Sequence, residues 1–122
     1  GIALQIHDRD AHDAVVETLL RVGAPETTVF HCFSGDEDLA RTVTFGNARN
    51  LHRAVAVADP ALLLVETDAP FLTPTPHRGR PNAPYLVPVT VRFMAAELGI
   101  ALDELCAQLA ANTLEVYGAF SD

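Results

Sequence analysis

Three apolar runs of this sequence each end in side chains of the kinds that bind metal ions. The runs and the polar residues behind them are 2–6 with His7, 27–30 with His31, and 62–65 with Glu66 and Asp68. Imidazole and carboxylate together suit a divalent cation that activates water, lowering its pKa from about 15.7 toward 7. A lone histidine or aspartate is better explained as a hydrogen-bonded or helix-capping residue, but the three together favour a metal site.

Glu66 and Asp68 stand two residues apart, so both side chains point to the same side of an extended strand. Two acids at the end of a strand buried on both faces are costly unless they are paired or bind a cation. We expect one of them to be a metal ligand and the other to support the ligands as a neighbour. The spacing leaves open which is which.

A second group of side chains could contact an anionic substrate, because arginine binds phosphate through two parallel hydrogen bonds. The candidates are Arg9, His77, Arg78, Arg80 and Asn82. Arg9 is equally well explained as a surface partner of Asp8 or Asp10. The other four lie in a proline-rich loop just downstream of Asp68, where the alternatives are a solvated loop and, for Asn82, a turn-holding role.

Alternating strands and helices must position these side chains. Apolar spacing predicts helices over 11–22, 36–41, 51–58, 87–98 and 102–116, and strands over 2–6, 27–33, 42–45 and 62–65. Such alternation is typical of a parallel sheet, and in an α/β barrel the active site lies at the carboxyl ends of the strands. The segment 69–88 has no periodicity, and a loop of this length in a compact protein is usually functional.

The composition is that of one ordinary core in an acidic chain. With 122 residues, the chain is too short for a whole eight-stranded barrel, which needs about 250. It starts within a predicted strand and without methionine, so we expect its beginning to be missing. The net charge is −8 and there is no lysine, so bound cations or an arginine cluster must attract any phosphate substrate.

Membrane and secretion signals are lacking. No stretch reaches the roughly 18 apolar residues of a membrane span, and the first residues lack the basic region of a secretion signal. Cys32 and Cys106 have no metal or redox spacing, which is typical of reduced, buried thiols. We therefore expect a cytoplasmic protein without a membrane partner.

Several motifs carry a resemblance to a known family. They are LQIHDRDA at 4–11, FHCFSG at 30–35, LVETDAPFL at 64–72, PHRGRPN at 76–82, ANT at 111–113 and VYG at 116–118. In this order and spacing they resemble the TatD family of metal-dependent deoxyribonucleases over nearly the whole chain. The resemblance implies an α/β fold, namely the C-terminal portion of a TIM (β/α)8 barrel of the amidohydrolase type.

The resemblance also implies hydrolysis of phosphodiester bonds in DNA, typically as an exonuclease, with divalent metal, as two ions of Mg, Mn or Zn. It makes His7, His31 and Asp68 the metal ligands and DNA the substrate. It makes Asp68 the catalytic residue that orients or deprotonates the attacking water. Glu66 is then left as the supporting neighbour.

The chain departs from the family at two places. Family members open with a His-x-His on their first strand and carry a metal-bridging glutamate later, and neither is present because the resemblance covers only the C-terminal half. The family also has an additional strand where Arg41 here runs directly into Thr42, with no turn residue between helix and strand. We therefore expect residues 1–122 to be a single partial domain with a segment missing between 41 and 42.

Two other readings of the sequence remain. The same scaffold could hydrolyse an ester or amide, because one fold hosts many chemistries. Alternatively, the chain by itself is an inert half-barrel that binds metal weakly, cleaves no DNA usefully, and self-associates through open sheet edges. The sequence suggests no obligate protein partner.

Overall fold

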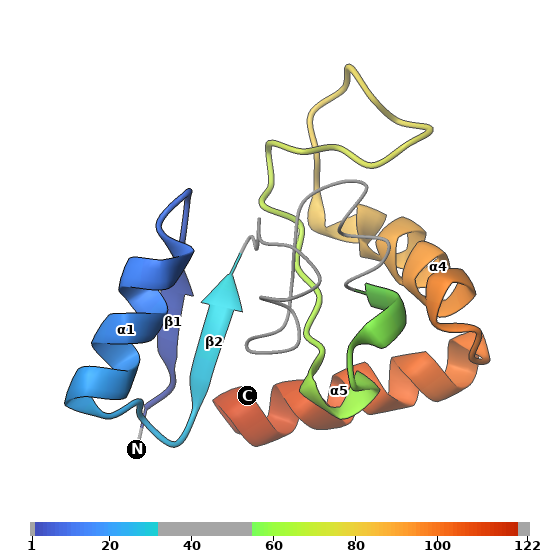
Figure 1. Cartoon of the computed structure of the whole chain (residues 1–122). Coiled ribbons are helices and arrows are strands. Elements are labelled where there is room, and N and C mark those ends of the chain that lie inside the picture. The colour runs from blue at the N-terminus through green and yellow to red at the C-terminus, as the bar shows by residue number, and fades with distance from the viewer. Residues whose placement is uncertain (1, 32–54, 120–122) are drawn as a thin grey trace.

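The structure is a computed structural model that describes residues 2–31 and 55–119. Its first part is a β–α–β unit made of β1 (Leu4–His7), α1 (His12–Val22) and β2 (Thr28–His31). The two strands are parallel, with Leu4 opposite Thr28 and His7 opposite His31 (Figure 1). The parallel pairing expected from strand–helix alternation is therefore confirmed for this unit.

Local contacts set both ends of α1. Asp8 is buried in the turn before the helix, and its Oδ1 accepts a hydrogen bond from the Ala11 amide at 3.1 Å. The other carboxylate oxygen contacts Nδ1 of His12. At the far end, Gly23 has a φ of 87°, and its amide donates to the Leu19 carbonyl at 2.9 Å. The helix predicted over 11–22 is present, and Gly23 ends it.

The strand predicted over 62–65 is not formed in the described part of the chain. Leu62 belongs to the short 3-10 helix η1 (Pro60–Leu62), and the residues from Leu63 to Asp68 have neither helical structure nor strand pairing. A strand needs a hydrogen-bonded neighbour, and no described strand pairs with this segment. We call residues 63–68 the acidic segment. It runs in the same direction as β1 and β2 (Figure 1).

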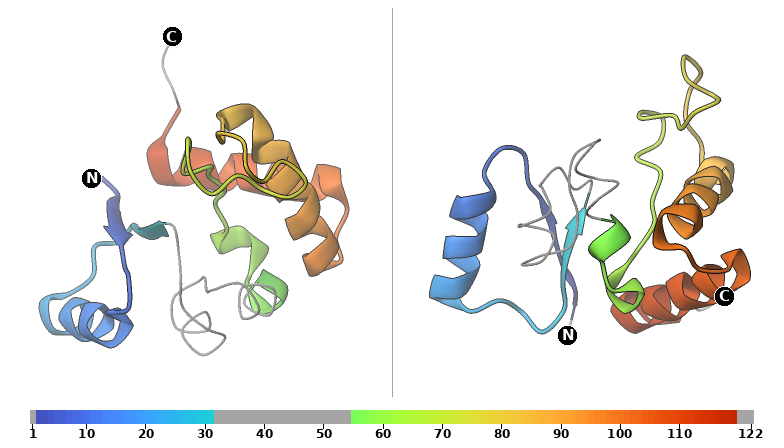
Figure 2. Two further views of the ribbon diagram at one scale, coloured as in Figure 1. Left: turned by 90° about the horizontal axis from the view of Figure 1, so that it is seen from above. Right: turned by 45° about the vertical axis from the view of Figure 1, so that its right-hand side comes forward.

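The C-terminal part contains η2 (Pro84–Leu86), α4 (Val87–Leu98) and α5 (Leu102–Tyr117). The last two elements confirm the predicted helices, and Gly99 ends α4 in the left-handed conformation at φ 67°. Figure 2 shows α4 and α5 packed together on the side of the acidic segment away from α1. The buried apolar residues are Val55, Ala58, Leu63, Val91, Met94, Ala95, Leu105 and Leu109. Among the described residues, the core thus lies between residues 55 and 109.

Several predictions fall outside the described residues. These are the helix over 36–41, the strand over 42–45, the junction of 41 with 42, and Cys32. Of the helix predicted over 51–58, residues 55–57 are described and are helical. Cys106 is free as predicted, but the expectation that it is buried is wrong. It is exposed on α5, next to the core residue Leu105 and on another face of the helix.

Within the described ranges, no single helix is long and apolar enough to cross a membrane. The segments Pro84–Leu98 and Leu102–Tyr117 reach that length only together, across a bend of 111°.

Candidate metal centre

The parallel register brings His7 and His31 together. The two residues face each other at the ends of β1 and β2, and their ring centroids lie 5.3 Å apart with the rings tilted by 44°. This proximity follows from the sequence pattern, because each histidine is the last residue of its strand. Two imidazoles at one sheet edge are a suitable start for a divalent metal site.

Glu66 supplies a carboxylate to the same place. Its Oε1 lies 2.7 Å from Nδ1 of His31, although the acidic segment is not paired to β2. Nδ1 is buried and makes no hydrogen bond of regular geometry in the described part of the chain, so the contact is an ion-pair contact by distance alone. A carboxylate beside one ring nitrogen orients a histidine and leaves its other nitrogen for a ligand.

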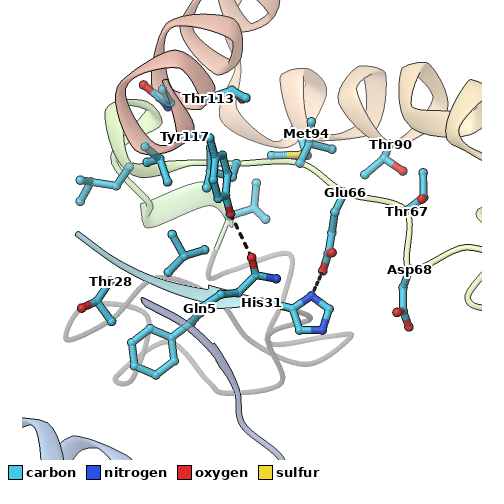
Figure 3. A pocket seen from close by; sticks show the side chains of 18 of the residues that line it. Gln5, Thr28, His31, Glu66, Thr67, Asp68, Thr90, Met94, Thr113 and Tyr117 are labelled. Atoms are coloured by element: carbon cyan, nitrogen blue, oxygen red, sulfur yellow. Dashed lines mark hydrogen bonds and ion pairs between the residues drawn. The ribbon is translucent and has the colours of Figure 1, made fainter. Parts of the chain in front are cut away.

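Asp68 stands apart from this group. It is half-buried, with a left-handed φ of 49°, and its carbonyl accepts a hydrogen bond from the Phe71 amide at 2.9 Å. In Figure 3 the Glu66 side chain reaches His31, while the Asp68 carboxylate lies to one side of that pair. Among the residues the structure describes, no three His, Cys, Asp or Glu side chains are close enough to hold a metal ion.

The donor types therefore suit a divalent cation, and His31 lies beside both His7 and Glu66, but the described residues do not gather three such side chains closely enough to hold an ion. A common site for His7, His31 and Asp68 stays a prediction.

A pocket of about 860 Å³ opens between β2 and the acidic segment. Its walls include Phe30 and His31 on one side and Glu66 and Asp68 on the other, with α4 and α5 closing it (Figure 3). Two other residues of its wall are joined by a hydrogen bond: the Tyr117 hydroxyl donates to Oε1 of Gln5 at 3.1 Å, which links α5 to β1. His31, Glu66 and Asp68 thus line a cavity large enough for a small ligand or a strand of polypeptide.

The loop 69–83 rises at the same end of the molecule as the carboxyl ends of β1 and β2 (Figure 1). Arg78 and Arg80 are exposed on it, and His77 is half-buried. Arg9 is exposed in the turn after β1. These positions leave the cationic side chains accessible, and their contact with substrate stays a prediction.

Asn82 is buried at 6% exposure and holds this loop from inside. Its Nδ2 donates to the carbonyls of Thr67 and Phe71 at 2.5 and 2.7 Å, and its Oδ1 accepts from the Ala83 amide at 2.9 Å. Of the two roles left open for Asn82 by the sequence, these bonds show the turn-holding one. A direct contact with substrate stays a prediction.

Asn112 is a second anchoring residue, and the sequence reasoning missed it. It is buried on α5, and its Nδ2 donates to the carbonyls of Pro60 and Leu63 at 2.8 and 2.7 Å. The bonds fix the start of the acidic segment against the helix. The available signal was a polar amide at a core-facing helical position, which is costly unless it is hydrogen-bonded.

Comparison with known proteins identifies relatives over most of the chain. The family described as TatD related DNase matches residues 1–118. A Mycobacterium tuberculosis protein named as an uncharacterized metal-dependent hydrolase, TatD, is 41% identical over 131 residues, covering 97% of this chain and 50% of that protein. The 3'-5' ssDNA/RNA exonuclease TatD of Erwinia amylovora is 32% identical over 133 residues, covering 93% and 51%. The chain thus spans about half the length of the curated relatives it matches.

Solved structures agree with the sequence relatives. The crystal structure of YJJV, a TatD homologue from Escherichia coli K12, matches with a TM-score of 0.84 and 27% identity, covering 97% of this chain and 51% of that one. A TatD family hydrolase from Entamoeba histolytica matches with a TM-score of 0.78 at 16% identity, which shows the fold alone. These neighbours have the TIM-barrel hydrolase fold, so the prediction that this chain forms part of a TIM barrel is confirmed.

Proposed function

Because the chain belongs to the TatD related DNase family, we propose that it is the C-terminal half of a divalent-metal-dependent hydrolase that cleaves phosphodiester bonds in DNA. The observation that supports this most directly is the meeting of His7, His31 and Glu66 at one edge of the fold. Imidazole and carboxylate groups in this position are ligands for Mg, Mn or Zn and have no evident role in the core.

Each residue has a distinct role in this proposal. His7, His31 and Asp68 hold the cation or cations, and Glu66 orients the His31 ring through the contact at Nδ1. A divalent cation supplies Lewis acidity, which makes water a nucleophile at neutral pH and neutralises phosphate charge. Asp68 accepts the proton of the attacking water, as its carboxylate lies within the pocket wall.

The choice of DNA over other substrates rests on charge and on one relative. The exposed Arg78 and Arg80 stand on the loop at the proposed site, and arginine recognises phosphate geometry well. The Erwinia amylovora relative is named as an exonuclease of single-stranded DNA and RNA, which favours an exonuclease here. The alternatives are an ester or amide hydrolase on the same scaffold, or a chain that is inert by itself.

The test is a nuclease assay with a labelled single-stranded oligonucleotide and added Mn²⁺, on the polypeptide that contains this chain with its N-terminal half. We expect metal-dependent release of nucleotides, and a loss of at least about 10²-fold in rate for Asp68→Asn. Asp103→Asn, an exposed substitution on α5, is the matched control and should keep the native rate. Cleavage of a carboxylic ester without cleavage of DNA would favour the alternative hydrolase.

We also propose that a segment is missing from residues 1–122 between 41 and 42. The part matching the Mycobacterium tuberculosis protein, 97% of 122 residues or about 118, is aligned over 131 positions, so about 13 positions of that relative have no counterpart here. That length suffices for one strand and its turns. Arg41 and Thr42 lie outside the described residues, and peptide mapping of the purified protein decides the point. A peptide in which Arg41 is bonded directly to Thr42 excludes an omission.

A further inference from the structure

We infer that Asn82 is a positioning residue that holds Asp68 in its left-handed conformation. The inference rests on the proposed function, because it gives Asn82 a purpose in the reaction attributed to Asp68. A φ of 49° is uncommon for a residue other than glycine, and such residues persist only where surrounding contacts fix them.

The side chain of Asn82 forms hydrogen bonds with residues before and after Asp68 in the chain. Its Nδ2 donates to the carbonyl of Thr67, which belongs to the peptide group that precedes Asp68, and to the carbonyl of Phe71 three residues beyond it. The rotation of that preceding peptide group defines φ of Asp68, so fixing its carbonyl fixes the backbone that carries the carboxylate.

Two backbone hydrogen bonds also hold the residues around Asp68. The amide of Asn82 donates to the Pro70 carbonyl at 2.9 Å, and the Phe71 amide donates to the Asp68 carbonyl at 2.9 Å. Residues 67–71 thus form a turn that is held by the buried side chain of Asn82. The side-chain amide of Asn82 suits this role, because a neutral amide can donate to two carbonyls at once while its oxygen accepts from the Ala83 amide.

The chain contains a matched control in Thr73. Thr73 is equally buried at 6%, and its hydroxyl donates to the Arg80 carbonyl at 2.5 Å, closing the same loop seven residues apart. The bond from its hydroxyl involves no atom of residues 67–71. Thr73→Val therefore loosens the loop without releasing Asp68, whereas Asn82→Asp keeps the shape and the acceptor oxygen but removes both donors.

Amide hydrogen exchange on the metal-free 122-residue chain is the first readout. We expect the Phe71 amide to exchange about tenfold faster in Asn82→Asp and Asn82→Ala, and to stay within about twofold in Thr73→Val. The second readout is the nuclease assay, in which kcat should fall about tenfold or more in the Asn82 variants with KM for DNA unchanged, while Thr73→Val keeps its kcat.

The outcomes separate this inference from the proposed function. Equal acceleration at Phe71 in Thr73→Val, no acceleration in the Asn82 variants, or equal loss of kcat in all three overturns the positioning role. If the native protein cleaves no DNA, the proposed function fails, and the exchange rates alone still decide whether Asn82 fixes the turn at Asp68.

Discussion

The side chain of Asn112 ties α5 to the start of the acidic segment, and its replacement by alanine tests how that segment is held. Nδ2 donates to the Pro60 carbonyl at 2.8 Å and to the Leu63 carbonyl at 2.7 Å, from a residue that is 4% exposed. Leu63 itself is fully buried. Asn112→Ala removes both bonds at once, next to the core residue Leu63.

The loss in free energy of unfolding depends on which hydrogen-bond partners the two carbonyls keep in the variant. The Pro60 carbonyl also accepts a hydrogen bond from the Leu63 amide at 3.3 Å and so keeps one partner in the variant. Losing its bond from Asn112 therefore costs about 1 kcal/mol, the net value of one hydrogen bond. Within the described residues, the Leu63 carbonyl accepts a hydrogen bond from Asn112 alone, and an unsatisfied buried carbonyl costs about 1–3 kcal/mol. We expect a total near 3 kcal/mol, or about 10 °C in Tm for a domain of this size.

Urea denaturation followed by far-UV circular dichroism measures this free energy. Gln108→Ala is the matched control, because it removes only the bond from Gln108 to Oδ1 of Asn112, at 2.8 Å and partly exposed. We expect that control to lose less than about 1 kcal/mol. The reasoning is refuted if Asn112→Ala is no less stable than Gln108→Ala, since the anchoring bonds would then contribute nothing specific.

Two further predictions concern the site and the missing segment. Glu66→Gln should weaken Mn²⁺ binding by about tenfold in isothermal titration, because the neighbour of His31 loses its charge, while Tm stays within a few degrees; unchanged affinity, or an equal loss in the exposed control Glu104→Gln, contradicts that role. Inserting the relative's 13 or so extra residues between Arg41 and Thr42 should raise Tm by about 5 °C or more, because an added strand would bury further apolar surface, and a scrambled insert that stabilises equally would speak against a strand there.

The sequence predicted the features that depend on short-range pattern. His7 and His31 close their strands, and parallel pairing then places them opposite each other without further information. Helices α1, α4 and α5 follow from apolar spacing, and each ends at a glycine. The segment 62–65 was apolar enough for a strand, but pairing requires a neighbour, and the pattern of one segment does not contain its partner.

The features that the sequence did not predict depend on contacts between distant residues. Asn112 reaches a carbonyl 49 residues away, and Asn82 reaches one 15 residues away. In both cases a side-chain amide satisfies backbone groups of an irregular segment, which no local propensity encodes. Glu66 was expected near the metal ligands from its spacing to Asp68, yet its direct contact with His31 arises only when the acidic segment lies beside β2.

The location of the core explains why the candidate site depends on a few polar contacts. No apolar residue in 2–31 is buried, although this unit carries two of the three proposed metal ligands. The third, Asp68, belongs to the part that holds the core, so a cation shared by all three would bridge two parts of the chain. Polar links between them include Glu66 with His31 and Tyr117 with Gln5. A ligand that binds only the assembled arrangement stabilises it by mass action, and metal binding and the docking of β1 and β2 must therefore strengthen each other.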